Sequence, residues 1–226
     1  MSNFLTTTFR KSHLLTQQAL ADLLASASHV FEKDRHGIKV AQLTDGTMIK
    51  VFRVKRLFSG AQFYSYARRF CRNIDRLKQR NIPVPEVLTL YHVKSSRLSV
   101  VHYSPLAGKT IKDLMKEGLL DDKLAYLVGE FIAKVHALGI YFRGLHIGNI
   151  VLTPDGELGL IDVSELSIYW HLSRYRRLRN FARFWRSQED AIQFGEANID
   201  AMVKGYILSL RYTEDWTKKI TKRLKV

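Results

Sequence analysis

The chain has 226 residues, 46% of them hydrophobic, which is enough to bury a substantial core and excludes an intrinsically disordered protein. Lysine and arginine outnumber aspartate and glutamate by 36 to 21. The formal net charge of +15 predicts attraction to polyanions such as nucleic acid, phosphorylated glycolipid or an anionic membrane surface. With Cys71 as its one cysteine, the chain has no internal disulfide framework and suits a reducing compartment.

The N-terminal stretch, residues 1–30, does not have the uninterrupted apolar core of a secretory signal. No apolar run in the sequence is long enough to span a bilayer. The sequence therefore predicts a soluble cytoplasmic protein whose positive charge also suits peripheral association with the inner membrane. The residues that interrupt the N-terminal stretch are Arg10, Lys11, His13, Gln17, Gln18 and Asp22.

Short apolar runs separated by turn residues dominate the first half of the chain and predict an antiparallel sheet. Turn residues at 34–37 and 44–47 separate the first three runs, which indicates a three-stranded meander. Leucines at helical spacing predict a short helix before the sheet, and an amphipathic basic stretch predicts another after the third strand. The predicted strands are 30–33, 38–43, 48–54, 87–91 and 98–102, and the predicted helices are 14–27 and 61–80.

The second half is predicted to be mostly helical, which makes the fold class α+β. Apolar residues recur at helical spacing from Leu124 to Val135, until Gly139 provides a stop. A polar loop follows at 143–149, and turn residues at 153–156 join two short strands. The predicted strands are 150–152 and 158–161, and the predicted helical segments are 111–117, 190–210 and the basic stretch 216–225.

This hairpin brings the end of the polar loop next to Asp162. Asn149 and Asp162 are 13 residues apart, which is the length of a tight hairpin that returns to its start. An amide oxygen and a carboxylate can hold a divalent metal against nucleotide phosphates. The pair predicts a phosphoryl-transfer site, and the structural alternative is a common helix and hairpin in which His146 and Asn149 are simple turn residues.

The motifs in this region resemble the protein-kinase-like superfamily. Residues 143–149, RGLHIGN, resemble its catalytic loop in the form found in small-molecule kinases, and residues 162–164, DVS, resemble its metal-binding DFG triplet. Within the superfamily, the chain is most similar to the bacterial lipopolysaccharide core kinases, which act on Kdo or heptose, and to the related toluene tolerance proteins. The segments that carry this similarity are TDGTMIKVFR, NIPVPEV, HYSPLAGKT and LGIYFRGLHIGNIVL.

The resemblance implies a two-lobed fold. The N-lobe, residues 1–105, would contain five antiparallel strands and a helix, and the C-lobe, residues 106–226, would be mostly helical. The implied cofactors are ATP and Mg²⁺. The implied partner is a phosphorylated glycolipid or lipopolysaccharide core, bound at a membrane surface.

The resemblance also assigns roles to individual residues. Lys50 would pair with nucleotide phosphates beneath a turn that contains Gly37, and Asn149 and Asp162 would hold the metal. His146 would lie in the catalytic loop. Two further residues, His102 and Tyr103, would lie in the hinge that receives adenine.

Two departures from the family's pattern concern activity. Gly144 stands where the family has its catalytic Asp, and Phe70 stands where a helix acid would pair with Lys50. General-base catalysis is typically worth about 10²–10⁴-fold in rate. Two interpretations therefore stay open: an attenuated kinase with His146 or Glu165 as its base, and a nucleotide-binding pseudokinase or scaffold in envelope biogenesis.

Arginine and aromatic residues alternate between residues 167 and 186, a composition that suits binding of a polyanionic substrate. The alternative is an ordinary helix with Leu178, Phe181 and Trp185 in the core and its arginines in water. A nucleic-acid-binding protein is disfavoured because no helix-turn-helix, zinc ligand set or RNA-binding signature accompanies the charge. The predicted substrate contacts are Arg143, Arg174, Arg176, Arg177 and Arg179.

Overall fold

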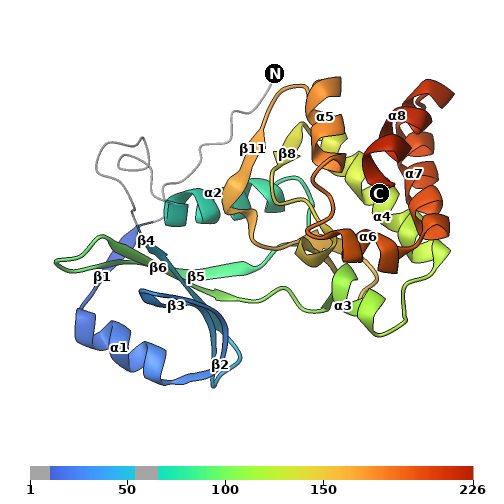
Figure 1. The fold of residues 1–226 in the computed structure, drawn as a ribbon. Helices are drawn as coiled ribbons and strands as arrows, with labels where there is room; N and C mark the ends of the chain where they lie inside the picture. Colours follow the sequence, from blue (N-terminus) through green and yellow to red (C-terminus); the bar gives the residue numbers. More distant parts are fainter. Residues whose placement is uncertain (1–10, 54–65, 226) are drawn as a thin grey trace. The chain divides into compact units, whose positions relative to one another are not determined.

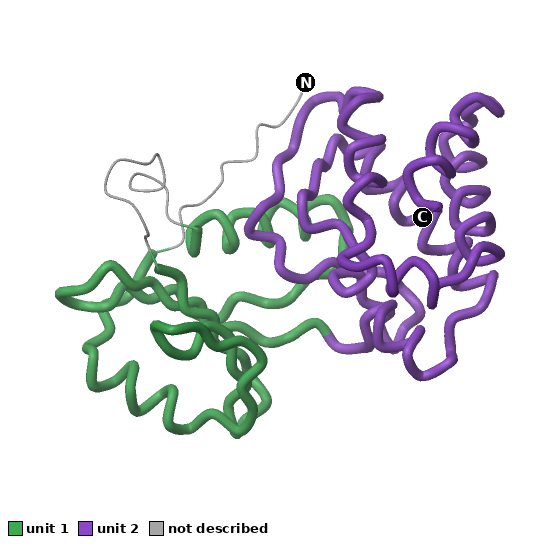
Figure 2. Tube along the Cα trace, viewed as in Figure 1, with its two compact units in different colours: residues 1–106 green, residues 107–226 purple. Residues whose placement is uncertain are grey.

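The computed structural model describes residues 11–53 and 66–225 and divides into two compact units (Figures 1 and 2). Unit 1 comprises Met1–Leu106 and unit 2 comprises Ala107–Val226. Unit 1 contains the large sheet, and unit 2 contains most of the helices (Figure 1). The predicted α+β class is confirmed.

Unit 1 is built on a six-stranded sheet with the order β1-β5-β6-β4-β3-β2. All neighbouring strands run antiparallel except β1 and β5, which are parallel and pair Ser12 with Leu90. The strands are β1 (Ser12–Leu15), β2 (Ala27–Asp34), β3 (Gly37–Leu43), β4 (Met48–Arg53), β5 (Glu86–Val93) and β6 (Leu98–Ser104).

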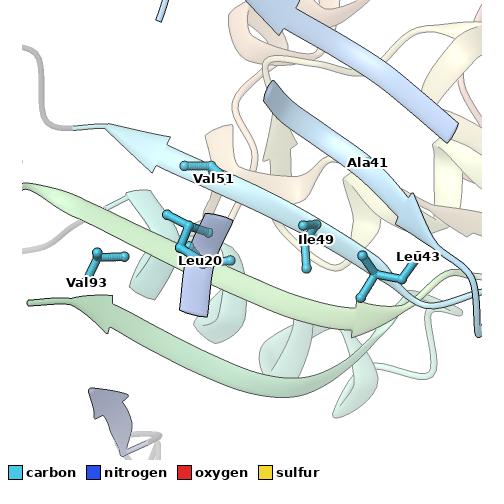
Figure 3. Packing of buried hydrophobic residues seen from close by; sticks show 7 residues of the cluster. Leu20, Ala41, Leu43, Ile49, Val51 and Val93 are labelled. Atoms are coloured by element: carbon cyan, nitrogen blue, oxygen red, sulfur yellow. The ribbon is translucent and has the colours of Figure 1, made fainter. Parts of the chain in front are cut away.

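Two helices cover opposite faces of this sheet, α1 (Gln17–Ala25) and α2 (Tyr66–Lys78). Successive residues of a strand point to opposite faces, so Ile49 and Val51 of β4 pack with Leu20 of α1. Figure 3 shows Leu20 among these side chains. Phe52 points to the other face and contacts Phe70 of α2, with a ring separation of 6.0 Å. The alternation of apolar residues along β4 therefore gives the sheet two packed faces.

The prediction of five antiparallel strands is wrong in number, because Ser12–Leu15 forms a sixth strand. The predicted helix 14–27 begins only at Gln17, where the Thr16 side chain accepts a hydrogen bond from the Ala19 amide. The short β1 acquires its partner from β5, far along the chain, so no local pattern marks it. Residues 54 and 61–65, at the ends of a predicted strand and helix, lie outside the described residues.

Unit 2 is mostly helical, as predicted, with two small sheets ordered β10-β9-β7 and β11-β8. The hairpin 150–161 is present, but β7, β8 and β11 were not predicted. Gly195 divides the predicted helix 190–210 into two. The helices are α3 (Ile111–Lys116), α4 (Asp122–Ala137), α5 (Arg174–Phe181), α6 (Gln188–Phe194), α7 (Glu196–Leu210) and α8 (Glu214–Leu224), and the strands are β7 (Lys109–Thr110), β8 (Ile140–Phe142), β9 (Ile150–Leu152), β10 (Leu158–Leu160) and β11 (Leu166–Ile168).

In unit 2, α4 packs directly against α7 (Figure 1). A Cβ atom on Gly129 would lie 1.9 Å from the Met202 carbonyl oxygen, and one on Gly205 would lie 2.2 Å from the Tyr126 carbonyl oxygen. Only glycine permits this approach, so the two backbones are in direct contact. Within the described ranges, no helix is both long and apolar enough to cross a membrane.

Candidate functional site

The polar loop 143–149 leaves the end of β8 and is anchored by two buried side chains. Leu145 and Ile147 are buried in the core of unit 2, and the Leu145 amide donates to the Phe142 carbonyl at 3.0 Å. Residues 147–149 form one turn of 3₁₀ helix that leads directly into β9. The loop is therefore held at both ends by strands and in its middle by apolar contacts.

Asn149 and Asp162 lie next to each other, as the hairpin predicts. The Ile161 amide donates to the Asn149 carbonyl at 3.1 Å, which joins the residue before Asp162 to the end of the loop. The Asn149 Nδ2 donates to the Gly144 carbonyl at 2.9 Å. Since a carbonyl can only accept, Nδ2 must face it, and Oδ1 is the atom of this amide that can coordinate a cation.

Asp162 has a left-handed backbone conformation, with φ at 53° and ψ at 42°. Aspartate tolerates this region better than most residues, and strained backbone often occurs at functional sites. In the described parts of the chain, no cluster of three or more His, Cys, Asp or Glu could hold a metal ion. The oxygens of Asn149 and Asp162 fit Mg²⁺, which commonly takes one or two protein ligands and completes its shell with phosphate and water.

Gly144 leaves no room for the side chain that the family pattern would place there. A Cβ atom at this position would lie 2.9 Å from Cε2 of Phe142 and 3.2 Å from Nδ2 of Asn149. The Phe142 ring is fully buried and cannot swing aside without opening the core. The loop thus has no carboxylate, and the Phe142 ring fills the space that a side chain at position 144 would need.

The His146 imidazole is held as a hydrogen-bond donor. Its Nδ1 accepts from the Gly148 amide at 3.1 Å. Burial, helped by the positive charge of Arg186, lowers the pKa of His146 to about 4, although Asp162 and Asp190 oppose the shift. The ring is therefore neutral near pH 7, with its proton on Nε2. The sequence interpretation of His146 as a substitute base does not suit this arrangement, because the unprotonated nitrogen is already occupied.

A partly buried ion pair beside His146 was missed in the sequence. The Lys112 Nζ lies 2.7 Å from Oδ1 of Asp190, whose side chain is almost completely buried. Oδ2 of Asp190 is buried without a hydrogen-bond partner among the described residues. Lys112 belongs to α3 and Asp190 to α6, and no local spacing signals their contact. The pair places a fixed positive and a fixed negative charge close to the loop.

A second buried polar network holds the start of the loop. His136 in α4 lies 2.9 Å from the Tyr206 hydroxyl through Nδ1 and 3.0 Å from Oδ1 of Asn180 through Nε2. The Asn180 Nδ2 donates to the Phe142 carbonyl at 2.9 Å. The donors therefore run from the Tyr206 hydroxyl to Nδ1 of His136, and from its Nε2 to Asn180 and on to Phe142.

The same network affects the ionisation of its members. Burial lowers the pKa of His136 to about 3, and Arg177 acts in the same direction, whereas the hydrogen bond that Nε2 donates to Oδ1 of Asn180 opposes the shift. Burial raises the pKa of Tyr206. His136 is consequently neutral in the folded protein at ordinary pH, which the alternating donors and acceptors require.

Four predicted nucleotide-binding residues belong to unit 1. Lys50 lies on the α2 face of β4, with its Nζ 5.7 Å from the Phe70 ring centre and 5.8 Å from that of Phe52. At the position where the family has an acid, the lysine thus meets an aromatic ring. Gly37 is the first residue of β3, directly after the turn that follows β2, with φ at 109°.

The predicted hinge residues are strand residues. His102 and Tyr103 lie within β6, which continues to Ser104. Tyr103 is buried and packs on Phe70 with a ring separation of 5.6 Å, whereas His102 contacts the Thr47 hydroxyl at 2.7 Å. Their side chains alternate between faces of the sheet, so both cannot line one adenine pocket through their side chains. A backbone role at an adenine edge stays a prediction.

The predicted substrate arginines differ in exposure. Arg143 is exposed, and its Nε lies 3.8 Å from Oε2 of Glu165. Glu165, the second candidate base, is therefore paired with this arginine. Arg177 is only 5% exposed, and its Nε donates to the Leu172 carbonyl at 3.0 Å. The prediction that Arg177 contacts a polyanionic substrate is therefore wrong, since its guanidinium supports the core of unit 2. Arg174, Arg176 and Arg179 have accessible side chains.

A comparison with known protein families supports the resemblance to lipopolysaccharide kinases. Residues 26–206 match the family described as the lipopolysaccharide kinase (Kdo/WaaP) family, which confirms the resemblance of the motifs. No curated protein sequence matches the chain. Among solved structures, the chain is similar to a Toxoplasma protein described as a divergent kinase that lacks the glycine-rich loop and regulates membrane ultrastructure of the parasitophorous vacuole, at 17% identity and a TM-score of 0.40. The match covers 78% of this chain and 58% of that protein, and at this TM-score nothing further is drawn from it.

Proposed function

The chain belongs to the lipopolysaccharide kinase (Kdo/WaaP) family, and from this premise we propose that it transfers a phosphoryl group from ATP to a sugar hydroxyl of a lipopolysaccharide core. Family membership supports the use of ATP and a core substrate. The adjacency of Asn149 and Asp162 at the end of the loop carries the proposal within the structure. A phosphoryl-transfer site needs oxygen ligands in fixed positions, and these two residues would supply them.

In this proposal the chain holds the nucleotide through its metal and its phosphates. Oδ1 of Asn149 and the Asp162 carboxylate would hold Mg²⁺, and Lys50 would pair with phosphate oxygens. A bound Mg²⁺ neutralises charge on the phosphoryl oxygens, which supplies much of the catalysis in this reaction class. The hydrogen bond from Nδ2 of Asn149 to the Gly144 carbonyl fixes the amide so that its Oδ1 is available to the metal.

The acceptor hydroxyl receives less help. Gly144 offers no carboxylate, and His146 presents a donor through Nε2, which can bind an acceptor oxygen or a phosphate but cannot take a proton. Transfer would then depend on positioning and charge. We propose a rate lower by about 10²–10⁴-fold than that of a relative with the loop carboxylate, the usual contribution of general-base catalysis.

A non-catalytic nucleotide-binding protein is the second candidate, and one observation favours it. The Phe142 ring closes the space where a catalytic side chain would stand, so the loop is stabilised in a form that does not accept one. In that case ATP would bind and the acceptor sugar would not be phosphorylated. The two candidates share a nucleotide site and differ only in turnover.

Nucleotide binding tests both candidates. ATP with Mg²⁺ should raise the melting temperature. At a nucleotide concentration of 100 times the Kd, binding adds about 2.7 kcal/mol to the free energy of unfolding. Asp162→Ala should abolish the shift. The matched control is Asp155→Ala, which removes an exposed carboxylate from the turn of the same hairpin and should leave the shift unchanged.

Turnover then separates the candidates. The parent should transfer radiolabelled γ-phosphate to purified core glycolipid slowly but above the Asp162→Ala background. Binding without transfer favours the non-catalytic protein. If ATP gives no Mg²⁺-dependent shift at millimolar concentration, both candidates fail.

A further inference from the structure

An aromatic cluster stands in solvent beside the start of α5. Trp170, between β11 and α5, is fully exposed and is the most exposed large hydrophobic residue in the described part of the chain. Tyr175 is 69% exposed on the first turn of α5, and Tyr169 is 37% exposed. A tryptophan that contributes its whole side chain to the surface gains nothing for the fold, which points to contact with something else.

Arginine side chains are ordered on this cluster. The Arg176 guanidinium lies 4.0 Å from the Tyr169 ring centre, and the Arg179 guanidinium lies 6.0 Å from that of Tyr175. Stacking fixes the plane of a guanidinium and leaves its N–H edges available for an anion. We call Tyr169, Trp170, Tyr175, Arg176 and Arg179 the aromatic–arginine surface.

The charge of this surface is not balanced locally. No Asp or Glu occurs between Glu165 and Glu189 in the sequence. Within the described ranges, neither Arg176 nor Arg179 forms a salt bridge, and Glu165 faces Arg143 instead. The nearest helix, α8, contributes carboxylates at Glu214 and Asp215, which pair with Lys218 and Lys219. The positive field beside Trp170 is therefore available to an external anion.

We infer that the aromatic–arginine surface binds an anionic phospholipid bilayer at its interface. Tryptophan and tyrosine favour the headgroup region, where one side of the ring is apolar and the other is hydrated. Each arginine near an anionic surface contributes about 1 kcal/mol of attraction. The choice of a bilayer over nucleic acid rests on the proposed function, since a lipopolysaccharide is anchored in a membrane.

The position of the surface in unit 2 suits that role. β8 and β11 pair Phe142 with Leu166 and Ile140 with Ile168. The loop begins at one end of this strand pair, whereas Tyr169 lies at the other, where its amide donates to the Gly139 carbonyl at 2.9 Å. A three-residue strand spans about 10 Å. Bilayer contact at Trp170 thus holds the loop close to lipid-anchored sugars.

Vesicle binding tests the inference without ATP or lipopolysaccharide. The protein should bind vesicles of phosphatidylglycerol and phosphatidylcholine and should not bind phosphatidylcholine alone. The fluorescence of Trp170 should shift to the blue, because Trp216 is already buried and Trp185 is half-buried with its Nε1 bonded to the Leu224 carbonyl. Added salt should weaken binding steeply.

Matched variants locate the contact. Trp170→Ala and the pair Arg176→Gln/Arg179→Gln should each weaken binding about tenfold or more, from the loss of interfacial anchoring and of about 1 kcal/mol for each arginine. Two controls should bind as the parent does: Ile192→Ala, which alters a 70% exposed residue on α6, and Lys123→Gln/Lys204→Gln, which removes two exposed cations from α4 and α7. Melting temperatures should match the parent's, since every altered side chain is accessible to solvent.

The outcomes separate this inference from the proposed function. Equal binding by the parent and Trp170→Ala overturns the aromatic–arginine surface, as does competition by duplex DNA or RNA that exceeds competition by anionic lipid at equal phosphate. Transfer to a deacylated, water-soluble core is measured separately. Transfer without vesicle binding overturns the inference alone, whereas vesicle binding without any nucleotide shift overturns the proposed function and leaves the surface established.

Discussion

At position 144 the absence of a side chain affects both the chemistry of the loop and the packing around it. The Phe142 ring and the Asn149 amide occupy the space around its Cα, so the loop would have to move to accept any side chain. Asn149 depends on that space, because its Nδ2 bonds to the Gly144 carbonyl. A side chain added at Gly144 would therefore change both the groups available in the loop and the packing of Phe142 in β8.

Gly144→Asp should therefore destabilise the protein without raising transfer. Overpacking of a well-filled core costs about 1–3 kcal/mol, and the Phe142 ring is fully buried. Urea unfolding should show the loss, and Gly144→Ala should show most of it, since the clash begins at Cβ. The double variant Phe142→Leu/Gly144→Asp opens room for the carboxylate and should transfer phosphate faster than the single variant. A stable Gly144→Asp with higher activity would show that the ring yields freely.

At the scale of elements, buried polar contacts join three helices to the loop. His136 of α4 connects Tyr206 of α7 with Asn180 of α5, and Asn180 bonds to the carbonyl at the end of β8. Each member satisfies a buried donor or acceptor of the next, so the loss of one leaves another unpaired. The orientation of the loop thus depends on buried contacts among α4, α5 and α7.

This network should make the fold sensitive to mild acid. The pKa of His136 is about 3 in the folded protein against 6.5 as its ordinary value, so the unfolded state binds the proton first. The stability due to neutral His136 is complete above pH 6.5 and is lost as the pH falls toward 3. Between about pH 7.5 and pH 5 the loss is about 2 kcal/mol.

Urea unfolding at both pH values measures this loss. His136→Gln should be less stable than the parent at pH 7.5 but should lose about 2 kcal/mol less on acidification. The exposed His171→Gln is the control and should behave as the parent does. If the parent and His136→Gln lose equal stability, His136 is not the group that titrates.

The sequence predicts elements whose signals are local. Leucine spacing in α4 and the turn at 153–156 are visible within a few residues, and the hairpin places Asn149 beside Asp162 for the same reason. The parallel pairing of β1 with β5, the Lys112–Asp190 pair and the burial of Arg177 depend on distant segments. Periodicity carries no information about them, because the partners are chosen only when the chain packs.

At the scale of the molecule, a net charge of +15 opposes compaction through self-repulsion. Raising NaCl from about 50 to about 500 mM shortens the Debye length from roughly 14 to 4 Å and should raise the melting temperature by a few degrees. A comparison variant of lower net charge is Arg183→Glu/Lys204→Glu, which replaces two exposed cations, lowers the formal charge from +15 to +11 and should show a smaller salt effect. A fall in melting temperature with salt would instead show that attraction within ion pairs such as Lys112–Asp190 contributes more to stability than repulsion among the excess cations removes.

The glycine contact between α4 and α7 also has a consequence for how the protein refolds. His136 and Tyr206, which flank that contact, are 70 residues apart in the chain, and the loop 143–149 lies between them. Joining such distant segments costs loop-closure entropy before the contact repays it, and folds that depend on these contacts form slowly. We expect the loop to reach its final geometry only after the two helices have met, so Asn149 and Asp162, the proposed metal ligands, should be among the last residues to become ordered during refolding.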